Sequence, residues 1–382
     1  MLQWCEMTGF TEVRRAGSWV LAVLALAVSG STIAGNSEQS CTSFAVSSPA
    51  GVYLADSEDG SWGHPGVEDP ESLALFFWPA SETAFGRMHI GMLWQRQHHS
   101  YQAGMNDQGL AYSATAVPHV EMKPHPERPL SWNDDHIWDS MLKGAANVAQ
   151  AVAIARSFDY TEGLWGQTMI ADASGDVAVV GPGNDGELAM TWKPIEKPFM
   201  VASTINVATG DSVGGDSEAR FDTATTMLSD ASNLSRLDPR TVGEVLQAVS
   251  RQNWYRLFNF NTYTVYSDYF DLEDRTASIW YLSNFDEVAR IDLDDELANG
   301  AHQVMLTDLF SAQTVEEALE EFDSIGRKGF VATLAIVAGM GLLLIVAVAL
   351  SVPRIVRRLR PASLETEETT TREKSPPTPV LG

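Results

Sequence analysis

Alternating or continuous runs of apolar residues, each bounded by turn-forming residues, recur between residues 41 and 281. Runs of this length and spacing are typical of β-strands. They predict strands at 41–46, 51–55, 89–94, 100–105, 110–116, 168–171, 177–180, 263–269 and 276–281. Residues 47–50, Ser-Ser-Pro-Ala, separate the first two runs, so these strands are predicted to form a hairpin.

Apolar residues spaced three or four positions apart predict helices elsewhere in the chain. The predicted helices are 135–142, 148–156, 218–228, 241–251 and 315–322. Two of them start with a capping box, formed by Thr241 with Glu244 and by Thr314 with Glu317. Because strands and helices do not strictly alternate, the pattern favours sheet layers covered by helices, an α+β fold.

The amino-terminal residues have the features of an export signal. Arg14 and Arg15 precede an apolar run at 19–28, and small residues follow at 29–31. This order predicts an export signal over residues 1–35. The apolar run is about 10 residues long, too short to span a bilayer unaided. Residues 36–40 are then a short pro-segment ahead of the mature protein.

The carboxyl-terminal region has the features of a membrane anchor. Residues 330–352 carry no charge and would span about 34 Å as a helix, enough to cross a hydrocarbon core. More basic residues follow this stretch than precede it, which places its carboxyl side in the cytoplasm. We therefore expect a single-pass cell-membrane protein with residues 41–323 outside, a transmembrane helix at 330–352, and a basic stop-transfer segment and disordered cytoplasmic tail at 353–382.

The charge of the chain excludes one class of partner. Lys and Arg number 25 against 50 Asp and Glu, for a net charge of −25. Nucleic-acid binding needs clustered positive charge, so no nucleic-acid partner is expected. The hydrophobic content of 45% is that of a packed globular protein.

Cys41 is the only cysteine outside the predicted export signal. It has no partner for an internal disulfide, and an unpaired thiol in an exported protein is a candidate reactive group. Taken by itself, a buried core cysteine is the commoner case. Lipidation is a third interpretation, but the polar residues 38–40 argue against it. If Cys41 were the first residue of the mature chain, its own α-amine could act as its base.

Several short motifs accompany Cys41 in a fixed order. They are Cys-Thr-Ser at 41–43, Asp-Ser-Glu-Asp at 56–59, Gly-Met-Asn-Asp-Gln-Gly-Leu at 104–110, Glu-Arg-Pro-Leu-Ser at 127–131, Ile-Ala-Asp-Ala-Ser-Gly-Asp at 170–176, Ser-Thr-Ile-Asn at 203–206 and Ser-Glu-Ala-Arg-Phe at 217–221. Together they resemble the choloylglycine hydrolase and penicillin V acylase group of N-terminal nucleophile (Ntn) hydrolases. Within it, the likeness is greatest to linear-amide hydrolases that include isopenicillin N acyltransferase-like proteins. It covers roughly residues 41–293.

This resemblance implies a four-layer αββα sandwich with the nucleophile at the start of a central strand. It implies self-processing that exposes Cys41, followed by hydrolysis of a linear, non-peptide amide bond in a small N-acyl substrate through an acyl-enzyme. No cofactor is implied. Histidines close together in sequence lack metal-ligand spacing, so no metal site is expected and we interpret them as surface residues: His89, His98, His99, His119 and His125.

The resemblance assigns catalytic roles to three residues besides Cys41. Asp59 matches the carboxylate that holds the amine of the terminal cysteine. Asn206 matches an asparagine near the cysteine, as an orienting group or oxyanion donor. Arg220 matches an arginine that supports the charges of the site. Without the resemblance, these residues would be interpreted as an exposed loop acid, a turn asparagine and a surface helix arginine.

Two positions depart from the family pattern. Asp56 stands where an arginine is usual, three residues before Asp59, and Ala116 stands where bile-salt and penicillin acylases place an oxyanion asparagine. The first change is compatible with another base, with a cationic substrate or with a degraded site. The second separates the chain from the bile-salt branch, so bile salts are not predicted as substrates.

The sequence leaves several functional alternatives open. An acyltransferase would use an amine in place of water, and N-terminal-cysteine dipeptidases share Cys41-Thr42 and Glu58-Asp59. A surface binding or scaffold protein that has lost the chemistry is the alternative from a different class. The sequence predicts neither the acyl and amine specificity nor the oligomeric state.

Overall fold

The predicted hairpin at the start of the globule forms strands β1 (Thr42–Ser48) and β2 (Gly51–Gly60). In the computed structural model the described residues are 41–49, 51–60, 69–94, 98–131, 137–161, 163–212, 215–229, 239–253 and 262–359. The predicted export signal, the pro-segment and the tail beyond residue 359 lie outside them. The chain divides into two compact units, Ala34–Gly329 and Met1–Ile33 with Phe330–Gly382.

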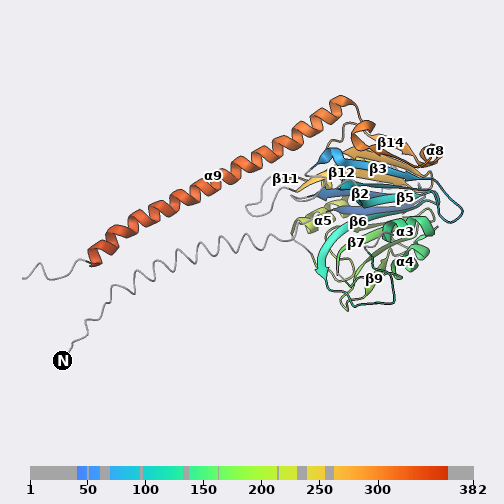
Figure 1. Ribbon diagram of the computed structural model, residues 1–382, viewed down its shortest axis with the longest axis horizontal. Coiled ribbons are helices and arrows are strands. Elements are labelled where there is room, and N and C mark those ends of the chain that lie inside the picture. The colour runs from blue at the N-terminus through green and yellow to red at the C-terminus, as the bar shows by residue number, and fades with distance from the viewer. Residues whose placement is uncertain are drawn as a thin grey trace, which may run out of the picture. The chain divides into compact units, whose positions relative to one another are not determined.

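The first sheet of the unit Ala34–Gly329 is antiparallel and contains the hairpin near its middle (Figure 1). Its strand order is β10-β1-β2-β12-β13-β14, and β11 also pairs with β12. The strands beyond the hairpin are β10 (Phe199–Ala202), β11 (Gln252–Asn253), β12 (Thr262–Asp271), β13 (Thr276–Tyr281) and β14 (Ala289–Asp292).

The second sheet is also antiparallel and has the order β15-β3-β4-β5-β6-β7-β8-β9. Most neighbours in this order are consecutive in sequence, which is typical of hairpin connections. Its strands are β3 (Leu73–Trp78), β4 (Arg87–Trp94), β5 (His98–Asn106), β6 (Leu110–Val120), β7 (Leu164–Asp172), β8 (Val177–Pro182), β9 (Leu188–Trp192) and β15 (His302–Met305).

Helices cover the outer faces of both sheets. The second sheet is covered by α3 (Ile137–Gly144) and α4 (Val148–Ala155), and the first by α5 (Gly215–Ser229) and α7 (Pro239–Val249). The other helices of the described residues are η1 (Pro70–Ser72), α8 (Leu293–Ala298), η2 (Leu306–Leu309) and α9 (Ala312–Leu359).

Side-chain alternation along the strands explains the layers. On β1, Ala45 belongs to the core between the two sheets, whereas Phe44 and Val46 pack with α7 residues such as Leu246. On β6, Ala111 faces the inter-sheet core and its neighbours face α3 and α4. These two strands therefore bury both faces, one against a sheet and one against helices. The described unit has the four-layer αββα arrangement that the sequence predicts.

All of the strands predicted from sequence are present; β13 has the predicted ends, and each of the others has at least one shifted end. The missed strands are short or lack an alternating pattern: β3, β9, β10, β11, β14 and β15. In β3 the sequence is Leu-Ala-Leu-Phe-Phe-Trp, a continuous apolar run because both of its faces are buried.

The predicted starts of two helices are wrong. The first, α7, begins at Pro239, two residues before the proposed capping residue Thr241. The second, α9, begins at Ala312. The Thr314 hydroxyl, which would cap the predicted helix, instead donates a hydrogen bond of 2.5 Å to the carboxylate of Glu287, a residue distant in the sequence.

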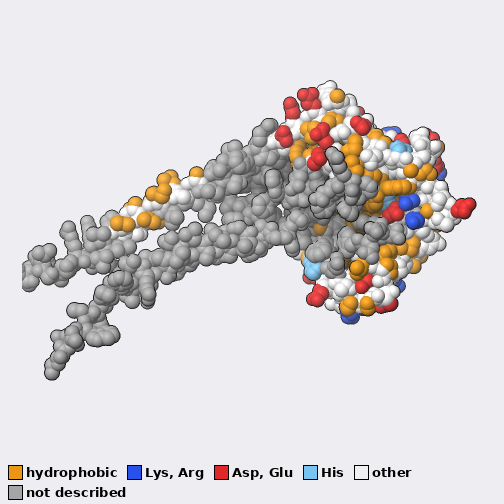
Figure 2. Space-filling view, viewed as in Figure 1, with side chains coloured by type: hydrophobic (Ala, Val, Ile, Leu, Met, Phe, Trp, Pro, Cys, Tyr) orange, Lys and Arg blue, Asp and Glu red, His pale blue; other side chains and the backbone are white. Residues whose placement is uncertain are grey.

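The long helix α9 runs through the stretch for which the sequence predicts a membrane span. Apolar side chains are exposed along its described part, as Figure 2 shows: Leu342, Leu343, Ile345, Val346, Val348, Leu350 and Val352. Among the described residues, no helix is both long enough and apolar enough to cross a membrane. The transmembrane helix at 330–352 stays a prediction.

Candidate active site

The thiol of Cys41 lies in the interior at the start of β1. The residue is 2% exposed, and its Sγ donates to Oε2 of Glu58 over 2.9 Å. The hairpin register causes this contact: Thr42 pairs with Ser57, so Cys41 and Glu58 adjoin across the two strands. The sulfur therefore touches a carboxylate, in contrast to the apolar surroundings of an inert core cysteine.

The inter-sheet face of the first sheet changes from apolar to polar towards Cys41. Residues two apart on a strand share a face, so cross-strand partners form successive rows. The rows are Ala45–Leu54–Phe270, then Ser43–Asp56–Asp268, then Cys41–Glu58–Tyr266. The apolar row belongs to the core, and the two polar rows place three carboxylates, those of Glu58, Asp56 and Asp268, on the sheet face that carries the sulfur.

Asp56 and Asp268 are fully buried in the middle row. Oδ1 of Asp56 accepts a hydrogen bond from the Ser43 hydroxyl at 2.8 Å. Its Oδ2 and both carboxylate oxygens of Asp268 have no hydrogen-bond partner among the described residues. Burial, and then the neighbouring carboxylates, raise the pKa of both groups well above the ordinary value for aspartate. Asp56 and Asp268 are therefore more stable as protonated acids, or as carboxylates beside a positive charge.

The same surroundings suppress the thiolate of Cys41. Burial raises its pKa well above the usual value, and the charges of Glu58, Asp56 and Asp59 raise it further. A thiol in such a place stays protonated until a base removes the proton directly.

Asp59 projects from β2 towards the helices, on the face opposite Glu58. Its Oδ2 accepts from Nη1 of Arg220 at 2.5 Å, and its Oδ1 accepts from the Thr264 hydroxyl at 2.5 Å. Nη2 of Arg220 also donates to the backbone oxygen of Cys41 at 3.4 Å. Burial raises the pKa of Asp59 to about 6, against the lowering effect of Arg220 and Arg251.

The structure thus brings together three of the four residues predicted from sequence: Cys41, Asp59 and Arg220. Asp59 is fully buried and Arg220 is 5% exposed. These positions exclude the simpler interpretations of an exposed loop acid and a surface arginine. The guanidinium bridges the carboxylate of Asp59 and the carbonyl of Cys41, and so links α5 to the start of β1.

Asn206 is buried but is engaged in its own turn. Its Nδ2 donates to the backbone oxygen of Pro182 at 2.9 Å, and its Oδ1 accepts from Ala208 N at 3.0 Å and Thr209 N at 3.3 Å. These contacts hold the chain after β10 against the end of β8. They do not join Asn206 to the cluster of Cys41, Asp59 and Arg220.

Glu58 is the residue that the sequence analysis missed. The predicted strand ended at residue 55, whereas β2 continues to Gly60. Had the strand been extended, its alternation would have placed Asp56 and Glu58 on one face and Asp59 on the other. The second half of β2 was missed because residues 56–59 are four polar residues in succession, a composition that is usual in exposed loops.

One histidine interpretation is wrong. His89 is fully buried, with its ring nitrogens 2.8 Å from the Tyr112 hydroxyl and 3.2 Å from Oδ1 of Asp139. Arg87 donates to the same carboxylate at 2.6 Å. Burial opposes ionisation of Asp139, but these hydrogen bonds outweigh it and lower its pKa. Within the described ranges, no group of three or more His, Cys, Asp or Glu residues could hold a metal ion.

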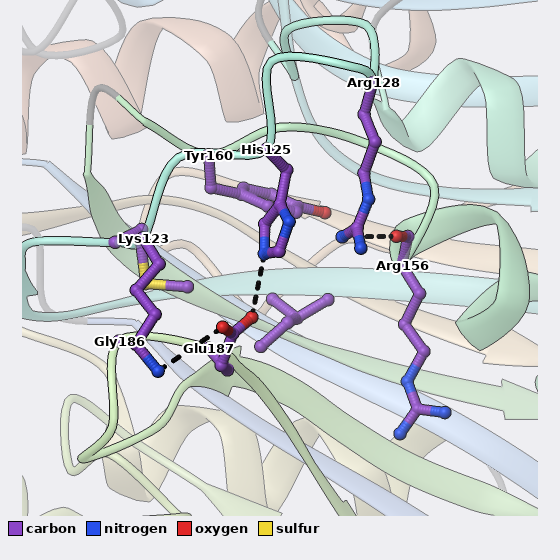
Figure 3. Close-up of a pocket in the computed structure, with 9 residues that line it drawn as sticks. Lys123, His125, Arg128, Arg156, Tyr160, Gly186 and Glu187 are labelled. Carbon is purple, nitrogen blue, oxygen red and sulfur yellow. Dashed lines mark hydrogen bonds and ion pairs between the residues drawn. The ribbon is translucent and has the colours of Figure 1, made fainter.

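A separate cavity of about 200 Å³ lies among the loop after β6, the end of α4 and the turn before β9 (Figure 3). Lys123, His125, Arg128 and Arg156 line it, together with Glu187. Glu187 accepts from Nε2 of His125 at 2.9 Å, and Nζ of Lys123 lies 3.5 Å from its other oxygen. Neither Cys41 nor the other residues predicted from sequence line this cavity.

No family model matches the chain, and no curated protein matches it. Among solved structures, a variant of conjugated bile acid hydrolase from Clostridium perfringens matches with a TM-score of 0.50, at 14% identity, over 69% of this chain and 96% of that one. A second variant of that hydrolase gives 0.48 with the same identity and coverage. Penicillin V acylase from Agrobacterium tumefaciens gives 0.44 at 16% identity, over 66% of this chain and 86% of that one.

The match to the first of these structures establishes the fold. The described chain has the fold of conjugated bile acid hydrolase, and the resemblance stated from the motifs is confirmed at that level.

Proposed function

We propose that this protein is an amidohydrolase that uses Cys41, freed as an N-terminal residue, to cleave a linear, non-peptide amide bond. One observation carries the proposal. The Cys41 thiol contacts the carboxylate of Glu58, and Arg220 of the Asp59–Arg220 pair contacts the backbone oxygen of Cys41, in a fold shared with a hydrolase of conjugated bile acids. An inert core cysteine would need neither group.

The proposed mechanism needs the α-amine of Cys41. This amine, with an ordinary pKa of about 7.7 to 8.0, takes the thiol proton at neutral pH. The thiolate attacks the amide carbonyl, the protonated amine gives its proton to the departing nitrogen, and an acyl-enzyme remains. Water then attacks the thioester, releases the acid and restores the thiol.

Three residues support this chemistry in the proposal. Asp59, held ionised by Arg220, orients the α-ammonium group of Cys41. Arg220 also fixes the backbone of Cys41 through its carbonyl oxygen. Asn206 serves as an orienting group or oxyanion donor through the second hydrogen of its Nδ2, since the first binds Pro182.

The proposed substrate is a small N-acyl amide, and it is not a bile salt. At position 116, where the oxyanion asparagine of the bile-salt branch is expected, the alanine side chain has no donor. Asp56 brings a carboxylate, and no guanidinium, next to Ser43 in the buried row. An anionic acyl group near that row would meet like charge.

Residues outside the catalytic unit support the proposed setting. The exposed apolar side chains of α9 favour insertion of that helix into a membrane, and the Arg14-Arg15 pair with the apolar run that follows favours export. We propose that the catalytic unit faces outwards from the cell membrane and that residues 353–382 are cytoplasmic.

Sequencing of the N-terminus and an amide-turnover assay test the proposal together. We expect the mature chain to begin at Cys41 and Cys41→Ser to lose amide turnover while its melting temperature is kept. Cys5→Ser, which alters the only other cysteine, is the matched control and should retain full activity. A chain that begins near residue 31 or 36 and hydrolyses no amide would instead support a scaffold protein.

A further inference from the structure

We propose that Glu58 is the catalytic base of the cleavage that frees Cys41, and that it afterwards binds the α-ammonium group which that cleavage creates. The inference rests on the proposed function, because it concerns how the same thiol is activated. It names the base of the self-processing that the family resemblance implies, in which the chain's own Ser40–Cys41 bond is the substrate.

The reaction needs a base other than the α-amine. Before cleavage, the nitrogen of Cys41 belongs to a peptide bond and has no basic lone pair. Burial raises the pKa of the thiol, so it does not ionise by itself at neutral pH. A carboxylate in hydrogen-bond contact with the sulfur can take the proton as the attack proceeds.

Among the buried carboxylates, Glu58 is the one that touches the sulfur. Its Oε2 lies 2.9 Å from Sγ, within the reach required of a general base. Asp59 binds Arg220 and Thr264 on the other face of β2. Asp56 accepts from Ser43 and belongs, like Asp268, to the next row of the sheet.

The proposed steps conserve atoms and charge. Glu58 takes the Sγ proton as the sulfur adds to the carbonyl carbon of Ser40. The carbon–nitrogen bond then breaks, Glu58 returns the proton to the departing nitrogen of Cys41, and a thioester joins the Ser40 acyl group to Sγ. Water hydrolyses this thioester to a carboxylate at Ser40 and a free thiol at Cys41. No cofactor or oxidant takes part.

Cleavage also supplies a positive charge beside the buried rows. Three carboxylates face the space between the sheets, and fully buried oxygens of Asp56 and Asp268 have no hydrogen-bond partner among the residues described. The hydroxyl of Tyr266, in the same row as Glu58, is likewise buried without one. A new ammonium group on Cys41 would lie beside Glu58 and favour ionised carboxylates. The cut chain is therefore the electrostatically stable form.

The test follows cleavage of the full chain, made by cell-free synthesis in detergent, by intact mass over time. Glu58→Gln keeps the shape of the side chain but removes the base, and we expect cleavage to slow by roughly 10²- to 10⁴-fold. Asp172→Asn is the matched control. It also removes a buried carboxylate, but one that binds Val148 N and Ser174, and it should cut at the wild-type rate.

A protease site placed directly before Cys41 separates cleavage from turnover. After release by that protease, amide turnover no longer depends on self-cleavage, so the cleavage rate and amide turnover are measured separately for each variant. Release should also raise the melting temperature of the wild-type chain at pH 7, and raise that of Glu58→Gln by less. Each comparison is made within one variant, so the effect of the substitution itself cancels.

Several results would overturn the assignment. They are a wild-type chain that never cuts itself, a Glu58→Gln chain that cuts at the wild-type rate, or a released Glu58→Gln chain whose melting temperature rises as much as that of the wild type. If Glu58→Gln does not fold, Glu58→Asp, which withdraws the carboxylate by one methylene, should cut at least tenfold more slowly, and an unchanged rate would refute the proposal. A released wild-type chain without amide turnover refutes the proposed function alone, since self-cleavage is scored separately.

Discussion

Arg220 on α5 and Asp59 near the end of β2 form an ion pair of 2.5 Å, although 161 residues separate them in the chain. Both side chains are buried, and Arg220 reaches the carbonyl oxygen of Cys41 from the same position. The pair therefore attaches a covering helix to the residue on which the proposed chemistry depends.

Loss of Arg220 should harm both stability and turnover. Arg220→Gln leaves the Asp59 carboxylate buried without its cation, and removing one partner of a buried pair typically costs about 3–5 kcal/mol. We expect the free energy of unfolding, measured with urea, to fall by that order and amide turnover to be lost.

Arg275→Gln provides the control for that experiment. Arg275 and Asp294 are also 2.5 Å apart, but their side chains are 35% and 53% exposed. Exposed pairs contribute about 0–1 kcal/mol, so this variant should remain close to wild type. Equal losses in the two variants would contradict a special role for the buried pair.

Turnover should depend on the ionisation of Asp59. Because burial raises the pKa of this carboxyl to about 6, acidification below pH 6 protonates it and releases the α-ammonium group. We expect kcat/KM to fall as the pH is lowered from 7 to 5. A flat profile over this range would remove Asp59 from the mechanism.

The stability contribution of Asp59 has the opposite dependence on pH. Its folded pKa lies above the unfolded value of about 3.9. The stabilisation is therefore fully present below about pH 3.9 and is lost as the pH rises through about 6. Loss of activity on acidification should thus not coincide with unfolding caused by this group, which far-UV circular dichroism would verify.

Asp268→Asn should stabilise the uncut chain at neutral and alkaline pH. Burial and then the charges of Asp56 and Glu58 raise the pKa of Asp268, so stability is lost as the pH rises through its folded pKa. In a Cys41→Ala background, we expect Asp268→Asn to raise the free energy of unfolding at pH 8. The gain should vanish near pH 3, where the carboxyl is protonated in both states. A lower free energy of unfolding for Asp268→Asn at pH 8 would show that the Asp268 carboxylate has a cationic partner.

Asn206→Ala should lower stability first. The substitution leaves the buried oxygen of Pro182 without its donor, which costs about 1–3 kcal/mol. The oxyanion role predicted from sequence adds a separate expectation, a fall in kcat on the order of a hundredfold. Urea denaturation and kinetics on the same preparation measure the loss of stability and the fall in kcat separately. Lower stability with an unchanged kcat would show that Asn206 stabilises its turn and has no role in turnover.

Removal of residues 330–382 should release the protein from membranes. The exposed apolar side chains of α9 between Leu342 and Val352 would then be absent. We expect the truncated chain in the soluble fraction after centrifugation, with amide turnover retained. The full chain should sediment with membranes, and a soluble full chain would contradict the anchor.

Local patterns in the sequence were sufficient for much of the sandwich. The alternation from residue 41 onwards and the Ser-Ser-Pro-Ala turn predicted the hairpin β1–β2 and the spacing of its strands. Those inferences succeed because strand period and turn chemistry involve residues that are near one another in the chain. The strand β3 was not predicted, because both of its faces are buried and its sequence is therefore apolar throughout, without alternation.

Only the tertiary structure decided which groups meet at the sulfur. Register between β2 and β12 brings Tyr266 opposite Glu58 and Asp268 opposite Asp56, and α5 delivers Arg220, from positions some 160 to 210 residues away in the chain. Nothing local distinguishes Glu58, beside the thiol, from an acid in a loop. Sequence determines what each strand can present, whereas pairing between distant strands determines what it faces, because that choice depends on the burial of the whole sandwich.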